Sequence, residues 1–334
     1  ELHRRARREG WTKPQFLRAA AQLDGIYVPG LYEVDYNADG TVKSITPKCG
    51  APKVVTKRIM RDMDKAVARI DRALAGGETI AVFGDYDVDG TTAVSLVFKY
   101  LRPYSSTLDF YIPDRYDEGY GISYKGIDYA AENGVSLVIS LDCGIKAIEK
   151  IEYAKEKGID FIICDHHMPD TTLPDAVAVL DAKRSDSIYP YEHLSGCGVG
   201  FKFMQAFAKS NNFPFSDLEK LLELTAVSIA SDIVPITGEN RILAYYGLKQ
   251  LNSNPSLGLK GIIDICGLPG KEITIRDIVF KIGPRINASG RMMNGKEAVE
   301  LLLSKDSASA REKSESINQY NEERGELDKK ITDE

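Results

Sequence analysis

The stretch that decides the fold of this chain is residues 79–90, which read Thr79-Ile80-Ala81-Val82-Phe83-Gly84-Asp85-Tyr86-Asp87-Val88-Asp89-Gly90. Its first half is an apolar run typical of a buried β-strand. Three carboxylates then follow within a few residues. Like charges this close repel one another and lose hydration when buried, so a neutralising divalent cation is expected. A solvated acidic turn is the alternative, because Asp and Gly are common turn residues.

Apolar segments of this kind recur through the middle of the chain and alternate with helical patterns. Further strands are predicted at 108–112, 136–141, 160–164 and 177–180, and helices at 61–74, 91–102, 124–133 and 147–157. Apolar strands separated by helices are typical of a parallel sheet that is covered on both faces. The predicted fold class is therefore α/β, with a doubly wound parallel five-stranded sheet.

The two ends of the chain differ from this pattern. Before the sheet, the sequence predicts a basic helical start at 4–22 and a hairpin whose turn is at 37–40. After the sheet it predicts a helical subregion, with helices at 198–209, 216–230, 240–251 and 257–266. The polar tail from 306 has helical periodicity but little apolar surface, so we expect a long exposed or connecting helix there.

Composition and cysteine usage limit the class of protein. With 334 residues, of which 43% are hydrophobic and 28% charged, the chain is typical of a globular protein. No apolar run approaches the roughly 20 residues that cross a bilayer. The cysteines lie far apart in the sequence without paired spacing, at positions 49, 143, 164, 197 and 266. A zinc knuckle or disulfide framework is therefore not expected, and a reducing, cytoplasmic location fits.

Charge is distributed unevenly along the chain. Residues 1–60 carry 11 Lys or Arg and 6 Asp or Glu, a net charge of +5, whereas the whole chain carries −6, which leaves −11 for the rest. An acidic balance argues against broad electrostatic capture of duplex nucleic acid. A local basic groove remains compatible with it, because net charge is a poor map of local potential.

Chemically active side chains follow several of the predicted elements at the points where they end. Asp142 follows strand 136–141, Asp165-His166-His167 follow strand 160–164, and Asp232 ends helix 216–230. Taken singly, these are ordinary features of a turn, a surface histidine pair and a helix end. Ligands of a doubly wound sheet bind beyond the carboxyl ends of its strands, however, so the coincidence indicates one shared site.

Several carboxylates with one or two imidazoles form a mostly oxygen ligand set. Such a set suits Mn²⁺ or Mg²⁺ better than a structural zinc ion. The number of carboxylates suggests two ions, held about 3.5–4 Å apart by a shared carboxylate as in two-metal phosphoesterases. A water between the ions would lose a proton near neutral pH and attack phosphorus.

Three segments together resemble the DHH phosphoesterases: residues 85–90, Asp165-His166-His167, and 283–291, which read Gly-Pro-Arg-Ile-Asn-Ala-Ser-Gly-Arg. Residues 114–121, 195–200 and 237–241 are also similar to the single-strand-specific 5′-to-3′ exonucleases of that family. The resemblance extends from about residue 62 to 334. It implies a hydrolase that cleaves phosphodiester bonds.

The resemblance also implies roles for individual residues. It implies metal ligation by Asp85, Asp87, Asp89, Asp142, His166 and Asp232, with Asp85 as either a ligand or a neighbour of the ligands. It assigns catalytic roles to Asp142 and His167, with His167 facing the phosphate. Some relatives carry a further His where this chain has Phe83.

Phosphate or DNA contacts are expected from a second group: Arg115, His167, Asn287, Ser289 and Arg291. A guanidinium grips a phosphate at two points and stays charged at all working pH values, so the two arginines are the expected clamps. For Arg285 a fold-stabilising role is an equal alternative. Tyr116 and Tyr120 either stack on bases or pack in the protein.

The resemblance thus predicts a metal-dependent 5′-to-3′ exonuclease that acts on single-stranded DNA in repair and recombination. Two Mn²⁺ or Mg²⁺ ions are the expected cofactors, single-stranded DNA is the expected partner, and a monomer without membrane contact is expected. One alternative is a phosphodiesterase for short oligonucleotides or cyclic dinucleotides. Another is an inactive scaffold, which would have lost metal ligands that this chain retains.

The domain prediction has three parts: an unrelated segment at 1–61, a catalytic domain at 62–304 and the start of a connecting helix at 305–334. The family implies a further DHHA1 domain and an oligonucleotide-binding barrel after that helix, so weak activity on long DNA is expected. Residues 29–47 resemble a segment of a radical S-adenosylmethionine protein, but no three-cysteine cluster accompanies them. We expect this segment to pack poorly on the rest, and a natural fusion and an artefactual join both remain open.

Overall fold

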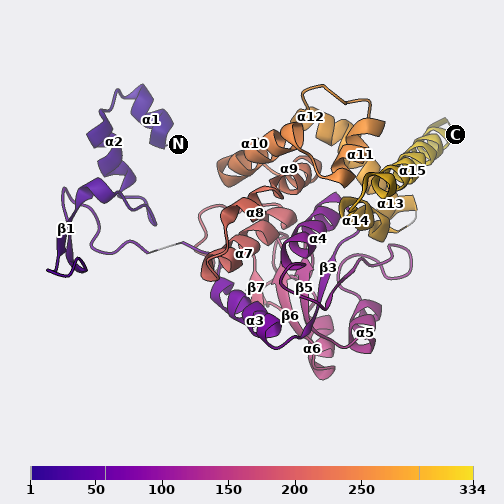
Figure 1. Ribbon diagram of the computed structural model, residues 1–334, viewed down its shortest axis with the longest axis horizontal. Helices are drawn as coiled ribbons and strands as arrows, with labels where there is room; N and C mark the ends of the chain where they lie inside the picture. Colours follow the sequence, from indigo (N-terminus) through magenta and orange to yellow (C-terminus); the bar gives the residue numbers. More distant parts are fainter. Residues whose placement is uncertain (1, 57, 293, 334) are drawn as a thin grey trace. The chain divides into compact units, whose positions relative to one another are not determined.

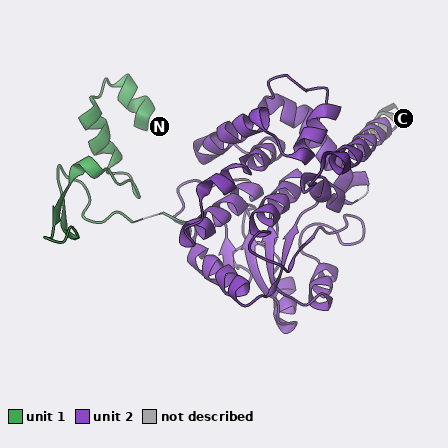
Figure 2. Ribbon diagram, viewed as in Figure 1, with its two compact units in different colours: residues 1–59 green, residues 60–334 purple. Residues whose placement is uncertain are grey.

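The computed structural model describes the chain except for residues 1, 57, 293 and 334 and the side chains of 328, 329 and 331–333. The chain divides into two compact units, residues 1–59 and 60–334 (Figure 2). The first unit contains α1 (Leu2–Arg8), α2 (Lys13–Ala20), η1 (Pro29–Leu31), β1 (Tyr32–Tyr36) and β2 (Val42–Pro47). The predicted hairpin is confirmed, because β1 and β2 pair antiparallel. The helical start is two helices rather than one, and Gly10 between them has a positive φ of 65°.

A five-stranded sheet forms the centre of the second unit (Figure 1). Its strands are β3 (Thr79–Gly84), β4 (Leu108–Tyr111), β5 (Val135–Leu141), β6 (Asp160–Cys164) and β7 (Ala178–Leu180). The spatial order is β4-β3-β5-β6-β7, and every neighbouring pair is parallel. The predicted fold class is confirmed, and each strand lies within two residues of its predicted bounds.

Both faces of the sheet are covered because successive side chains of a strand point to opposite sides. Ile80 and Val82 of β3 belong to one hydrophobic core, and Ala81 and Phe83 belong to the other. The first core is shared with α3 (Met63–Ala75), α4 (Val88–Leu101) and α7 (Gly196–Ser210), and the second with α5 (Tyr124–Glu132) and α6 (Ile148–Glu156). This is the doubly wound arrangement.

The region after the sheet is helical, as predicted. It comprises α8 (Phe215–Glu219), α9 (Leu222–Ser231), α10 (Gly238–Ser253), α11 (Leu257–Ile265), α12 (Ile275–Asp277), the π-helical turn η2 (Ile278–Ile282), α13 (Gly283–Met292), α14 (Gly295–Leu302) and α15 (Ser307–Asp333). Two expectations were wrong. The single helix predicted at 216–230 is broken into α8 and α9. The tail helix α15 also packs on the core through its first turns, where Ala310 and Ile317 are buried.

The strand order locates the crevice where a ligand of this fold would bind. Chain-consecutive β4 and β5 lie on opposite sides of β3, so the strand order reverses between β3 and β5. The crevice beyond the carboxyl ends of those two strands is the expected ligand site.

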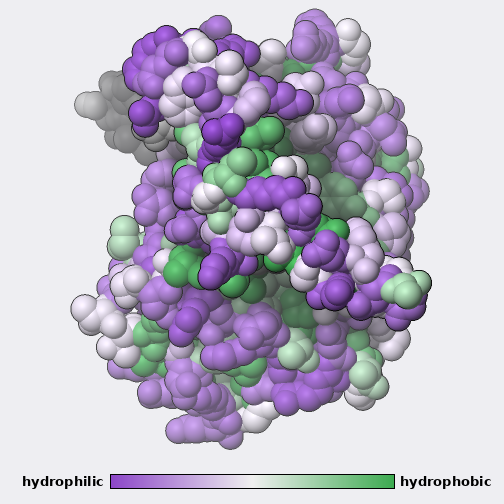
Figure 3. All heavy atoms as spheres, turned by 90° about the vertical axis from the view of Figure 1, so that its left-hand side faces the viewer, coloured by the Kyte–Doolittle hydropathy of each residue, from purple (hydrophilic) through white to green (hydrophobic). Residues whose placement is uncertain are grey.

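The face drawn in Figure 3 is mostly hydrophilic, with small hydrophobic patches between the polar side chains. Among the described residues, no helix combines the length and apolarity needed to span a bilayer.

Candidate metal centre at the carboxyl edge of the sheet

The turn after β3 is tight, and two glycines make it possible. A Cβ atom on Gly84 would collide with the Val94 side chain, and one on Gly90 would collide with the backbone of Asp85. Asp87 caps α4, because its Oδ1 accepts a hydrogen bond of 3.0 Å from the Gly90 amide. The helix thus begins at Val88, three residues earlier than predicted. As a result, the carboxylates of this motif lie at a strand-to-helix turn.

Asp89 is buried and is held by the start of α7. Its carboxylate accepts hydrogen bonds from the amides of Gly196, at 2.6 Å, and Cys197, at 2.8 Å. The Ser228 hydroxyl of α9 donates a third bond, of 2.7 Å. A helix N-terminus favours a nearby negative charge, and this network fixes the orientation of the Asp89 carboxylate. Residues 195–200 entered only as part of the family resemblance, and this support was not predicted from the sequence.

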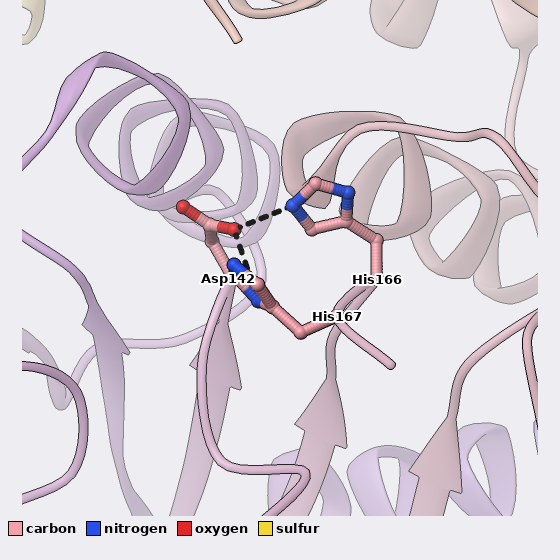
Figure 4. Close-up of side chains that lie close together, drawn as sticks. All are labelled: Asp142, His166 and His167. Atoms are coloured by element: carbon pink, nitrogen blue, oxygen red, sulfur yellow. Dashed lines mark ion pairs between the residues drawn. The ribbon is translucent and has the colours of Figure 1, made fainter. Parts of the chain in front are cut away.

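The carboxylates of three segments converge on one imidazole nitrogen. His166 Nε2 lies 3.0 Å from Asp142 Oδ1, 3.6 Å from Asp89 Oδ2 and 3.7 Å from Asp232 Oδ2. Figure 4 shows Asp142 and both histidines pointing toward one another from the ends of neighbouring strands. Ligand atoms around an ion with bonds of about 2.1 Å are themselves about 3 Å apart. The spacing therefore fits a shared divalent ion.

The electrostatic properties of this cluster also suit the binding of a divalent cation. Among the described residues, Asp142 Oδ1 and Asp232 Oδ2 are buried and accept no hydrogen bond. Burial, followed by repulsion from Asp89, raises the pKa of Asp142 well above its usual range and that of Asp232 to about 7. Burial lowers the pKa of His166 and favours the neutral imidazole that binds metals. The donor atoms are those preferred by Mn²⁺ or Mg²⁺.

Asp85 and Asp87 lie beside this convergence rather than within it. In the described part of the chain, two groups of side chains have ligand atoms close enough for one ion: Asp142 with His166 and His167, and Asp89 with His166 and Asp232. Burial and the neighbouring Asp87 raise the pKa of Asp85 to about 7, and burial and Asp89 raise the pKa of Asp87. The charges of both residues also raise the pKa of Asp142, so they add to the same acidic cluster.

His167 is oriented by a carboxylate that belongs to its own motif. Asp165 Oδ1 accepts hydrogen bonds from the His166 and His167 amides and lies 2.7 Å from His167 Nδ1, while Oδ2 accepts from the Ile145 amide. The bond to Asp165 raises the pKa of His167. Nε2 then points away from Asp165, with the Tyr120 hydroxyl at 3.2 Å. This makes His167 suited to move a proton at Nε2.

Arg115 and Arg291, the arginines predicted to bind phosphate, lie on two different segments. Arg115 contacts the turn at residues 85–90, and the two segments contact each other. The Arg115 guanidinium stacks over the Tyr86 ring, 5.4 Å from its centroid. Arg291 is exposed near the end of α13, and its carbonyl oxygen accepts a hydrogen bond of 2.8 Å from the Tyr116 hydroxyl. The loop carrying Arg115 and the helix carrying Arg291 are therefore joined directly.

The other side chains of α13 that were predicted to bind phosphate are less accessible than Arg291. Ser289 is fully buried, and its hydroxyl donates to the Ile286 carbonyl, so the structure does not bring it to the surface. Asn287 is partly buried on the same helix. Arg285 donates to Asn318 of α15 and to the Lys281 carbonyl, which matches the fold-stabilising alternative. A single sequence does not reveal these burials because α13 has apolar and polar residues on all sides.

Comparison with known proteins agrees with this geometry. The family described as "DHH family, N-terminal domain" matches residues 79–229, from the start of β3 to within α9. Over these residues the chain is similar to the DHH family.

Several of the relatives found by sequence are named RecJ. The chain is 40% identical over 275 residues to the single-stranded-DNA-specific exonuclease RecJ of Bacillus subtilis, covering 82% of this chain and 34% of that protein. It is 34% identical to the Haemophilus influenzae RecJ, covering 80% of this chain and 48% of that protein. The chain thus spans a third to a half of the length of these relatives.

Solved structures give the same result. A crystal structure of exonuclease RecJ bound to manganese superposes with a TM-score of 0.75 and 29% identity, covering 82% of this chain and 69% of that one. RecJ from Thermus thermophilus in complex with Mn²⁺ gives a TM-score of 0.72 and 27% identity, covering 81% and 39%. The fold of the second unit is therefore the RecJ fold.

Proposed function

We propose that this chain is a metal-dependent, 5′-to-3′ exonuclease for single-stranded DNA that works in cytoplasmic DNA repair and recombination. The observation that carries the proposal is the convergence of Asp89, Asp142 and Asp232 on His166 Nε2, at the sheet edge where the fold binds ligands. The relatives named single-stranded-DNA-specific exonuclease, and the manganese-bound RecJ structure, support the substrate and the metal.

Each residue of the centre has a role in this proposal. Asp87, Asp89, Asp142, His166 and Asp232 hold two Mn²⁺ or Mg²⁺ ions, and Asp85 acts as a further ligand or a neighbour of the ligands. When bound, the ions supply an activated water and neutralise charge on the phosphate. Asp142 would be the central ligand, because its Oδ1 is buried, accepts no hydrogen bond from the described residues and lies 3.0 Å from His166 Nε2.

The other residues handle the substrate. His167 Nε2 faces the scissile phosphate and donates a proton there, because Asp165 holds Nδ1 and raises the pKa of the ring. Arg115 and Arg291 bind the terminal 5′-phosphate and select that end of the strand. The phosphate contacts predicted for Asn287 and Ser289 require α13 to rearrange when the substrate binds, because Ser289 is buried.

The test is Mn²⁺-dependent digestion of single-stranded DNA labelled at the 5′ or the 3′ end. The full chain should release mononucleotides from the 5′ end, and Asp142→Asn should lower the rate about a thousand-fold or more, because the central ligand is lost. Asn tolerates the left-handed backbone at this position, where φ is 59°, so the fold should survive. The matched control is Asp175→Asn, an exposed aspartate paired with Lys155.

Two outcomes would contradict the proposal. Activity that is unaffected in Asp142→Asn would exclude the centre described above. A series of substrate lengths in which only di- and trinucleotides or cyclic dinucleotides are cleaved would favour the small-substrate phosphodiesterase instead.

Residues 1–59 have no role in the proposed reaction, and we propose that they pack poorly on the second unit.

A further inference from the structure

Tyr86 occupies an unusual position in the acidic turn. It lies between two of the proposed ligands, Asp85 and Asp87, yet its ring is partly buried against the larger hydrophobic core. Its ring edge contacts Tyr120, with the centroids 6.1 Å apart and the planes nearly perpendicular. Packing against the core limits the motion of the Tyr86 ring. A side chain that lies over this ring is therefore kept close to the turn at residues 85–90.

The group that lies over the Tyr86 ring is the guanidinium of Arg115, whose central carbon is 5.4 Å from the ring centroid. Arg115 is exposed and forms no ion pair with any carboxylate in the described part of the chain. An exposed arginine normally loses much rotamer freedom when it grips a ligand. A planar ring beneath the guanidinium removes part of that loss in advance, while the hydrogen-bond donors along its edge stay free for a phosphate.

The backbone of Tyr86 meets the element that carries the second arginine. A Cβ atom on Gly290 would collide with the Tyr86 carbonyl oxygen, and one on Gly295 would come within 3.0 Å of Tyr86 Cα. Gly290 immediately precedes Arg291, whose carbonyl oxygen accepts the Tyr116 hydrogen bond. The metal turn, the Arg115 loop and the start of the Arg291 segment therefore meet at one residue.

We propose that the Tyr86 ring positions Arg115 relative to the metal centre, next to the segment that carries Arg291, and so strengthens the preference for a 5′-phosphorylated end. This inference rests on the proposed function, because it assumes that the two arginines bind the terminal phosphate. A merely structural Tyr86 would affect folding or metal binding but would not distinguish a phosphorylated end from a hydroxyl end. That distinction is the readout that separates the two roles.

The experiment compares kcat/KM for single-stranded DNA with a 5′-phosphate and with a 5′-hydroxyl, using the full chain and Mn²⁺. Tyr86→Leu should reduce the preference for the phosphate about five-fold, within the range expected for loss of a cation–π contact. Tyr86→Phe, which keeps the ring, should restore it. Affinity for Mn²⁺, measured by calorimetry, should change less than two-fold. The matched control is Tyr153→Leu, another tyrosine beneath a cation, Lys157 at 4.8 Å, on the opposite face of the sheet.

A double-mutant cycle tests whether Tyr86 acts through Arg115. In an Arg115→Met background, Tyr86→Leu should have little further effect on the preference, because the stacked partner is already gone. Additive losses in the two variants, or a Tyr86→Leu chain with wild-type preference, would overturn the inference. If Tyr86→Leu does not fold, Arg115→Lys replaces it: the charge is kept but the planar stack is lost, and an unchanged preference would overturn the inference equally.

Failure of the proposed function gives a different result. A wild-type chain without Mn²⁺-dependent nuclease activity would contradict the exonuclease proposal itself. In that case the ratio of the dissociation constants for 5′-phosphorylated and 5′-hydroxyl oligonucleotides, measured by fluorescence anisotropy on the same variants, still tests Tyr86. A ratio that falls in Tyr86→Leu and returns in Tyr86→Phe supports the inference, and a ratio that is the same in all variants overturns it.

Discussion

The two edges of the central sheet both carry clustered carboxylates, but only the amino edge pairs them with a buried arginine. At the amino edge, Arg69 lies between Glu78 and Asp160, with nitrogen–oxygen distances of 2.6 Å to each. Burial raises the pKa of Glu78, but the hydrogen bond from Arg69 outweighs it and the net pKa is lowered. At the carboxyl edge, burial and repulsion raise the pKa of Asp85, Asp142 and Asp232.

This difference separates a structural cluster from a functional one. A carboxylate group that is buried with an arginine is complete without a ligand. Carboxylates that are buried with only an imidazole carry negative charge that the protein does not balance. A divalent ion bound among them would balance that charge. Carboxyl pKa values that are raised at one edge and lowered at the other therefore indicate where the chemistry occurs.

The largest expected effect of a single substitution on folding is at the amino edge. Arg69→Met leaves Glu78 and Asp160 without their buried partner, and because both are partly exposed the free energy of unfolding should fall by about 2–3 kcal/mol. Urea denaturation measures this loss. Affinity for Mn²⁺ should stay the same, since the metal edge is not touched. A variant that loses Mn²⁺ binding while folded would show that the two edges are not independent.

The next effect concerns pH. Asp85 and Asp232 have folded-state pKa values near 7, above their usual value, so the folded chain binds more protons than the unfolded chain between about pH 4 and 7. Without metal, these groups should make the free energy of unfolding fall as pH rises through that window, by about 1.4 kcal/mol per pH unit for each group. Saturating Mn²⁺ should remove this slope. Melting temperatures at pH 5.5, 6.5 and 7.5, with Mn²⁺ and with chelator, test it, and a metal-independent profile would contradict it.

A smaller effect is expected when the acidic cluster loses one charge. Asp142→Asn should stabilise the metal-free chain at pH 7.5 by about 1–2 kcal/mol, because buried like-charge repulsion is relieved. The same substitution should abolish most of the stabilisation that Mn²⁺ gives to the wild type. Thermal unfolding with and without Mn²⁺ measures both. Destabilisation of the metal-free variant would mean that Asp142 is a fold-supporting residue rather than a ligand held ready.

The smallest effect sharpens what makes the amino edge stable. Arg72 also contacts Asp160, at 3.2 Å, but its side chain is 66% exposed. Arg72→Ala should therefore change the free energy of unfolding by at most about 0.5–1 kcal/mol, since exposed ion pairs contribute little. Urea denaturation beside Arg69→Met provides the comparison. An effect equal to that of Arg69→Met would show that burial is not what gives the inner arginine its importance.

Much of the fold and of the candidate site follows from the sequence. Strands β3 and β6 were predicted to the residue because apolar runs end abruptly at Asp or Gly. The parallel strands share a carboxyl edge, so Asp89, Asp142 and His166 were expected together, and Asp232 joins them from the end of α9. These are consequences of local pattern and topology.

Other features depend on packing that a single sequence does not carry. The burial of Ser289 follows from how α13 is seated, and the support of Asp89 by Ser228 joins residues 139 positions apart. The break between α8 and α9 interrupts a sequence that is helical in pattern throughout. In α15, small side chains such as Ala310 and Ser314 allow close approach to α11, which hydrophobicity alone does not reveal.

The most direct measurement is an isothermal calorimetric titration of the metal-free chain with Mn²⁺ near pH 7, in two buffers of different ionisation enthalpy. We expect saturable binding of two ions per chain, with release of protons because the carboxylates with raised pKa values must ionise. Asp142→Asn should lose that binding, and Arg69→Met should keep it. Absence of Mn²⁺ binding by the folded chain, or binding that is unchanged in Asp142→Asn, would contradict the assignment of the carboxyl edge as a metal centre.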